Sequence, residues 1–91
     1  MSRPHGTAYI DIYENCYPHK FGNMKRLATI KTNANGKTPA SLQAASDDTA
    51  RRHGLVPKGN WKKGSIPDNR AETYQRFCTD GHLLSLSYWI K

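Results

Sequence analysis

Two pairs of side chains in this sequence have the spacing of metal ligands. His19 follows Cys16 after two intervening residues, and His82 follows Cys78 after three. Two thiolates and two imidazoles form a common ligand set for tetrahedral zinc. The two pairs are far apart in the sequence, however, and the hairpin predicted for residues 72–91 puts Cys78 and His82 on opposite faces of a sheet. We therefore expect neither a metal nor another cofactor.

The same argument weighs against catalysis by a cysteine. A thiol nucleophile needs an oriented histidine beside it, and Cys78 and His82 are the nearest such pair in the sequence. Asp47 and Asp48 do not form an acid/base pair, because neighbours on a helix point about 100° apart. We predict no catalytic residues and interpret the protein as a non-enzyme.

Positive charge is the strongest functional signal in the chain. The 91 residues include 14 Lys and Arg against 7 Asp and Glu, so the formal net charge is +7. Such a field favours phosphate backbones or acidic protein surfaces as partners. The basic residues recur along the chain and two tryptophans lie among them. We predict partner contacts at nine positions: Lys25, Arg26, Lys31, Lys58, Trp61, Lys62, Lys63, Arg76 and Trp89.

Length and composition exclude several classes of protein. No apolar run approaches the roughly 18 residues of a membrane span, and no apolar stretch follows Met1–Gly6 as in a signal peptide. Two cysteines are too few for a disulfide framework. We expect one small cytoplasmic domain over residues 1–91, with reduced thiols and no membrane partner.

The N-terminal half contains signals for two strands and a helix. Residues Thr7–Tyr13 alternate apolar and polar side chains with a period of two, which predicts a half-buried strand. Lys25–Thr32 predicts a second strand. Thr38 and Pro39 are well suited to begin a helix over Ala40–Arg52, because threonine caps free N–H groups and proline is tolerated in the first turn.

The C-terminal half predicts a long loop followed by a hairpin. Residues 55–71 contain prolines, glycines and basic residues around one tryptophan, and we predict a long basic loop there. Glu72–Thr79 and His82–Lys91 are predicted strands, joined by a two-residue turn at Asp80-Gly81. The fold class is therefore α+β: a four-stranded antiparallel sheet in the order ββαββ, with one helix packed on one face.

A two-residue turn also predicts which side chains share a face. It sets Cys78 opposite Leu83 and Phe77 opposite Leu84. The face under the helix then holds Phe77, Leu84, Leu86, Tyr88 and Ile90, and the opposite face holds Tyr9, Tyr13, Tyr74, Arg76 and Trp89. Rings beside cations can stack unpaired bases. The same composition occurs at protein interfaces, and the loop around Trp61 could instead cover this face.

Two segments resemble a known group of proteins. The stretch Ile10–Asn15 and the basic strand Lys25–Thr32 are similar to the opening of small phage-encoded anti-CRISPR proteins, and the size and layout of the chain are similar as well. Many such inhibitors are acidic mimics of DNA, whereas this chain is basic. The resemblance therefore implies a member that binds guide RNA, DNA or acidic patches of a CRISPR surveillance complex.

These observations lead to one functional hypothesis and two alternatives. The hypothesis is a non-enzymatic basic protein, phage-encoded and located in the host cytoplasm, that blocks a host CRISPR nucleoprotein complex by occupancy. The first alternative is a small RNA- or DNA-binding protein that uses an aromatic and basic sheet face. The second is a small basic ribonuclease toxin, which would cleave RNA with Arg, Lys, His and Tyr side chains.

Overall fold

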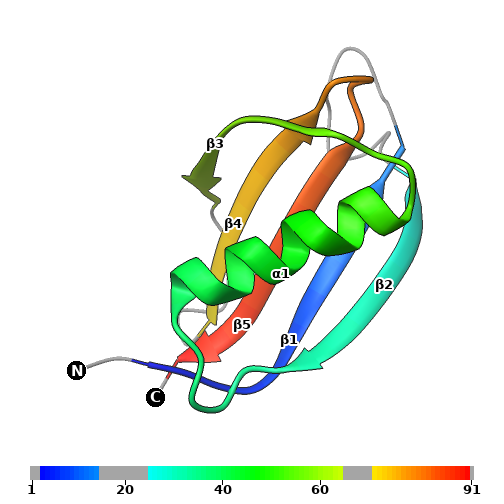
Figure 1. Ribbon diagram of the computed structural model, residues 1–91. Helices are drawn as coiled ribbons and strands as arrows, with labels where there is room; N and C mark the ends of the chain where they lie inside the picture. Colours follow the sequence, from blue (N-terminus) through cyan, green and yellow to red (C-terminus); the bar gives the residue numbers. More distant parts are fainter. Residues whose placement is uncertain (1–2, 15–24, 65–70, 91) are drawn as a thin grey trace.

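One antiparallel sheet and one helix that crosses it make up the computed structural model, which describes residues 3–14, 25–64 and 71–90 (Figure 1). The strands pair in the order β2-β1-β5-β4-β3, so β2 and β3 form the two edges of the sheet. The elements in chain order are β1 (Pro4–Tyr13), β2 (Arg26–Asn33), α1 (Pro39–Arg52), β3 (Pro57–Lys63), β4 (Ala71–Cys78) and β5 (Leu83–Ile90).

The predicted four-stranded ββαββ sheet is wrong, because the sheet has a fifth strand. This strand, β3, lies within residues 55–71, where we predicted a long loop. Its sequence, Pro-Lys-Gly-Asn-Trp-Lys-Lys, has no apolar alternation, and only Trp61 packs against the core. Such a sequence is tolerated at a sheet edge, where proline can stand at the first position of a strand. The α+β character and the antiparallel pairing are as predicted.

The helix begins where the sequence predicts. The N–H of Thr38 donates to Oγ of Ser41 at 3.0 Å, and the N–H of Ser41 donates to Oγ1 of Thr38 at 3.1 Å. This reciprocal pair satisfies two N–H groups at the helix start. Leu42 and Ser46 are buried against the sheet. Because serine is small, α1 can lie close to the strands that it crosses.

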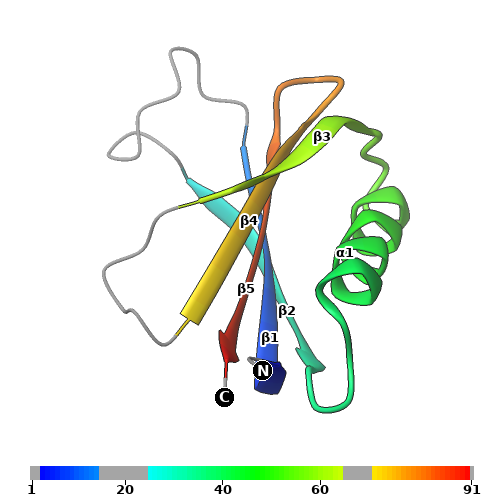
Figure 2. The ribbon, with the colours of Figure 1, turned by 90° about the vertical axis from the view of Figure 1, so that its left-hand side faces the viewer.

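The core lies between α1 and the two central strands. Ile10 and Ile12 of β1 and Leu84, Leu86 and Tyr88 of β5 are each at most 2% exposed. Figure 2 shows α1 on one side of the sheet, and the helix contacts β1, β5 and β3. The predicted burial of Leu84, Leu86 and Tyr88 is therefore confirmed.

The predicted register of the C-terminal hairpin is wrong by one residue. Cys78 and His82 enclose a three-residue loop: the N–H of Cys78 donates to the carbonyl of His82 at 2.8 Å, and the N–H of Gly81 donates to the carbonyl of Cys78 at 2.9 Å. Gly81 has a φ of +91°. A tight turn followed by a left-handed glycine is the common three-residue alternative to the two-residue turn. Phe77 therefore lies opposite Leu83, not Leu84.

This shift reverses the faces of β4, because side chains alternate along a strand. Tyr74, Arg76 and Cys78, which we predicted on the face away from the helix, lie on the helix side. Phe77, predicted in the core, points to the other face and is 41% exposed.

Candidate functional site

The sheet face that points away from α1, which we call the far face, carries a regular pattern of side chains. Residues paired directly across antiparallel strands share a face, so the register defines rows that cross the sheet. One row, which we call the aromatic row, contains Arg26, Tyr13, Leu83, Phe77 and Lys58. The next contains Thr29, Asp11, Ser85, Gln75 and Lys62, and the third contains Lys31, Tyr9, Ser87 and Thr73.

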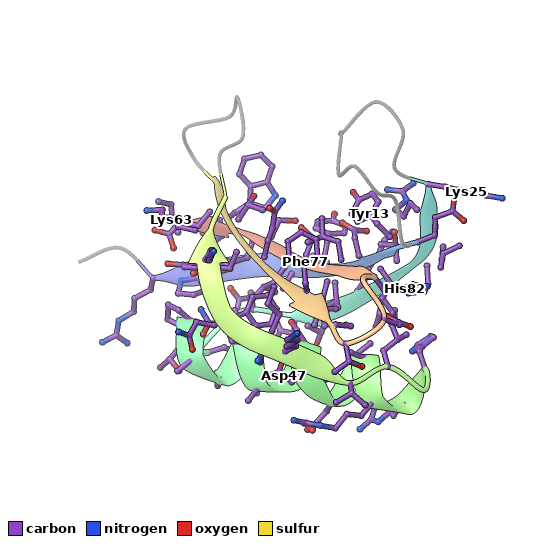
Figure 3. All side chains as sticks on the ribbon, turned by 90° about the horizontal axis from the view of Figure 1, so that it is seen from above. Tyr13, Lys25, Asp47, Lys63, Phe77 and His82 are labelled. Carbon is purple, nitrogen blue, oxygen red and sulfur yellow. The ribbon has the colours of Figure 1, made fainter. Side chains whose placement is uncertain are left out.

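The aromatic row places two rings between two cations. Tyr13 and Phe77 lie on either side of Leu83, which is 3% exposed. Arg26 at the β2 edge and Lys58 at the β3 edge are both exposed. In Figure 3 the side chain of Tyr13 lies on the side of the sheet opposite α1. With about 4.8 Å between neighbouring strands, the two edges of the sheet lie roughly 19 Å apart.

Cations at the β2 edge contact the far-face side chains of β1. The ammonium group of Lys31 lies 5.9 Å from the centroid of the Tyr9 ring, within the range of a cation–π contact. Nη1 of Arg26 lies 4.0 Å from Oδ1 of Asp11, and Oγ1 of Thr29 donates to the same oxygen at 2.5 Å. The charge of Asp11 is therefore compensated locally.

The phenol of Tyr13 stays protonated. Its burial raises the pKa above the ordinary value, the charge of Asp11 raises it further, and Arg26 opposes the change. A neutral phenol keeps its hydroxyl as a hydrogen-bond donor and presents a ring without added negative charge.

Six of the nine residues predicted as partner contacts lie on or beside the far face. Lys25 directly precedes β2 and is exposed, and Trp89 shares the parity of Ser85 and Ser87 on β5. The other four are members of the rows: Arg26, Lys31, Lys58 and Lys62.

The other three predicted contacts lie on the helix side. Lys63 pairs with Tyr74, and its ammonium group lies 3.8 Å from Oε1 of Glu72. Trp61 packs against the core, with the Arg76 guanidinium 5.7 Å from the centroid of its ring. The structure therefore does not bring these three residues together with the far-face cations.

Arg76 is held by an internal network. Its Nη1 donates to both carboxylate oxygens of Asp47 at 3.0 Å, and its Nη2 donates to the carbonyl oxygen of Gly59. The side chains of Arg76 and Asp47 are each only 16% exposed. Arg76 thus joins β4 to α1 and to β3.

The predicted placement of Cys78 and His82 on opposite faces is wrong, because the corrected register sets them directly across from each other. Nδ1 of His82, however, lies 2.9 Å from Oδ1 of Asp80. Cys16 and His19 lie outside the described residues, and no group of three or more His, Cys, Asp or Glu side chains is placed for a metal among residues 3–14, 25–64 and 71–90. Cys78 is 3% exposed. Burial and the nearby charge of Asp80 raise the pKa of its thiol, which keeps it in the weakly nucleophilic protonated form.

Sequence reasoning missed Phe77 as a far-face residue and Gln75 as its neighbour in the next row. The available signal was Gly81, which also permits a three-residue hairpin loop.

Comparisons with known proteins found no similar family, sequence or structure: no family model, curated protein or solved structure matches the chain. In the part of the chain that the structure describes, no helix is long and apolar enough to cross a membrane.

Proposed function

We propose that this protein binds single-stranded nucleic acid on its far face and acts by binding, without catalysis. The observation that carries the proposal is the aromatic row, in which Tyr13 and Phe77 stand between Arg26 and Lys58. Stacking of a base on an aromatic ring contributes about 1–3 kcal/mol and tolerates any sequence. Cations at both ends of the row contact the phosphates.

The charges of the far face favour one arrangement of a bound strand. Asp11 lies in the interior of the face and is compensated by Arg26 and Thr29, so a phosphate gains little there. Lys31 and Lys62 lie at opposite edges of the sheet. Lys62 is in the row next to the aromatic row, and Lys31 is in the third row. On the central strand β5, Leu83 and Ser85 are only 3% and 7% exposed, so the bases lie against the rings of Tyr13 and Phe77, and the phosphates lie over the edges.

A fluorescence-anisotropy titration tests this proposal. The probe is a labelled single-stranded oligonucleotide of about 12 nucleotides, within the usual site sizes of such proteins. Each phosphate contact contributes about −0.7 to the slope of log K against log salt, so four contacts give about −3.

A matched pair of charge reversals locates the binding surface. Lys31→Glu should weaken binding about tenfold or more, because repulsion replaces attraction on the far face. Lys37→Glu changes the net charge equally but lies in the exposed turn before α1, so its effect should be severalfold smaller. Equal losses in the two variants, or binding that does not depend on salt, would contradict the proposal.

A second candidate is the blocking of a host CRISPR nucleoprotein complex by occupancy, which stays a prediction from the resemblance. The observation that favours it is the exposure of large apolar side chains: Leu27 is 50% exposed on β2, and Phe77 is 41% exposed on β4. Tight binding to a purified CRISPR complex, with weak binding of free oligonucleotides, would favour this candidate over the first.

A further inference from the structure

A pocket of about 430 Å³ lies at the β3 edge of the sheet, where β3 bulges away from β4. Between the pairs Lys58–Phe77 and Lys62–Gln75, three residues of β3 face one residue of β4. Gly59 stands in this bulge with a φ of +72°, and a Cβ built on it would meet no heavy atom within 4 Å. The bulge therefore interrupts the pairing of β3 with β4 at the place where these described residues line the pocket.

Four side chains of the far face line this pocket, and together they offer three kinds of interaction. Phe77 provides an aromatic surface that is 41% exposed. Gln75 provides an amide with both donors and acceptors. Lys58 and Lys62 provide two exposed ammonium groups.

The combination is selective for a class of ligand. A simple anion would use the lysines but not the ring, and an apolar molecule would use the ring but neither the lysines nor the amide. A nucleotide uses all three, because its base is flat and carries hydrogen-bonding edges while its phosphate is anionic.

Other charges near the pocket decide where the phosphate lies. The guanidinium of Arg76 is already occupied by Asp47 and Gly59, so it adds little attraction for an anion. Asp80 follows Thr79 at the hairpin end, and its carboxylate is close enough to raise the pKa of Cys78. A phosphate is therefore favoured on the β3 side of the pocket, where Lys58 and Lys62 stand on either side of the bulge.

We propose that the β3–β4 pocket binds a single nucleotide, with the base against Phe77 and Gln75 and the phosphate between Lys58 and Lys62. This inference rests on the proposed function and deepens it. It assigns the pocket as the subsite that binds one nucleotide of the strand most specifically. The pocket lies at the β3 end of the aromatic row, because Phe77 and Lys58 belong to both, and it gives one base of the bound strand a concave site.

The test uses adenosine 5′-monophosphate as the probe and NMR titration of the full chain as the measurement. The expected result is a set of saturable shift changes centred on the backbone amides of Lys58, Lys62, Gln75 and Phe77. Ribose 5-phosphate and adenosine should each bind about tenfold or more weakly than the nucleotide, because each lacks one half of the ligand. Equal binding of ribose 5-phosphate would mean that only an anion is recognised and would overturn the proposal.

Two variants distinguish the pocket from the rest of the far face. Phe77→Ala should weaken nucleotide binding about tenfold, and Tyr9→Ala, which removes a ring on β1 outside the pocket, should leave it unchanged. A Phe77→Leu variant keeps the apolar volume but removes the ring, so its loss of binding reports stacking and not unfolding. Shift changes centred on Tyr9 and Lys31 would overturn the assignment.

The outcomes also separate this inference from the proposed function. If the oligonucleotide binds with the expected sensitivity to Lys31→Glu but the nucleotide leaves the pocket amides unchanged, the pocket assignment fails and the far-face proposal stands. If the nucleotide binds in the pocket but the oligonucleotide shows no salt-dependent binding, strand binding fails and the pocket remains a site for nucleotides.

Discussion

Arg76 of β4 donates from one nitrogen to both carboxylate oxygens of Asp47 on α1, at 3.0 Å each. This pair connects elements that are 29 residues apart in the sequence, and both side chains are only 16% exposed. Figure 3 shows Asp47 on α1, in the layer beneath the sheet. Because Arg76 also donates to Gly59, the pair fixes the helix, β4 and the bulge of β3 in one arrangement.

Asp47→Asn should therefore destabilise the protein by about 2 kcal/mol, the usual range for a hydrogen bond to a charged group. Its neighbour provides the control, because Asp48 is 64% exposed and pairs with the exposed Arg51 at 3.2 Å. Asp48→Asn should change the stability by less than about 0.5 kcal/mol. Urea denaturation measures both, and equal effects would mean that the Arg76–Asp47 pair does not connect the two layers as described.

The corrected register predicts a small cost for truncating Phe77. A phenylalanine in the core loses about 3–5 kcal/mol on replacement by alanine, but Phe77 is 41% exposed. We expect about 1 kcal/mol for Phe77→Ala and about 2–5 kcal/mol for Leu86→Ala, which is fully buried. If Phe77→Ala lowered the free energy of unfolding as much as Leu86→Ala, Phe77 would lie in the core, as the two-residue turn predicts.

The parts of the fold that the sequence predicts are those with local or periodic signals. The alternation of β1, the Thr38–Ser41 cap and the apolar face of β5 each depend on a few neighbouring residues. The strand β3 lacks such a signal, because an edge strand with Trp61 as its contact with the core needs no alternation. The strand β3 forms because it pairs with the edge of β4, and this contact depends on the tertiary fold and not on a local sequence signal.

The candidate site was only partly predictable for a related reason. The cations of β2 and β3 were identified from charge alone, but their arrangement in rows depends on the register of five strands. One extra loop residue at Gly81 exchanged Arg76 for Phe77 on the far face. The pattern of charges therefore predicts the residue types of the site, whereas the hairpin geometry determines which residues lie on the far face.

Alkaline pH should destabilise the protein through Tyr88. Its hydroxyl donates to Oε2 of Glu72 at 2.7 Å, and burial, together with Glu72, raises its pKa far above the ordinary value. A raised pKa contributes stability that is complete below the unfolded-state pKa of about 10 and is lost at higher pH. Above pH 10 the free energy of unfolding should fall by about 1.4 kcal/mol per pH unit from this group alone.

Tyr88→Phe provides the matched comparison. It should cost about 1 kcal/mol at pH 7, where the hydrogen bond to Glu72 is lost, but the difference from the original protein should shrink between pH 10 and pH 11. Denaturation at several pH values measures the difference, and absorbance near 295 nm follows the tyrosinates. Parallel stability curves for the two proteins over this range would show that Tyr88 ionises as readily when folded as when unfolded.

Lys62 and Lys63 are consecutive residues whose side chains lie on opposite faces of the sheet. A comparison of the two therefore tests directly whether the far face binds the oligonucleotide. Lys62 pairs with Gln75 on the far face, whereas Lys63 pairs with Tyr74 and contacts Glu72 on the helix side. Lys62→Gln and Lys63→Gln remove the same charge at neighbouring positions, so any contribution of net charge cancels between them. Lys62→Gln should reduce the salt slope of oligonucleotide binding by about 0.7, and Lys63→Gln should leave the slope nearly unchanged. A larger change in the salt slope for Lys63→Gln than for Lys62→Gln would place the bound strand on the helix side. Only a phosphate beside the Lys63 ammonium group would release a counterion from it.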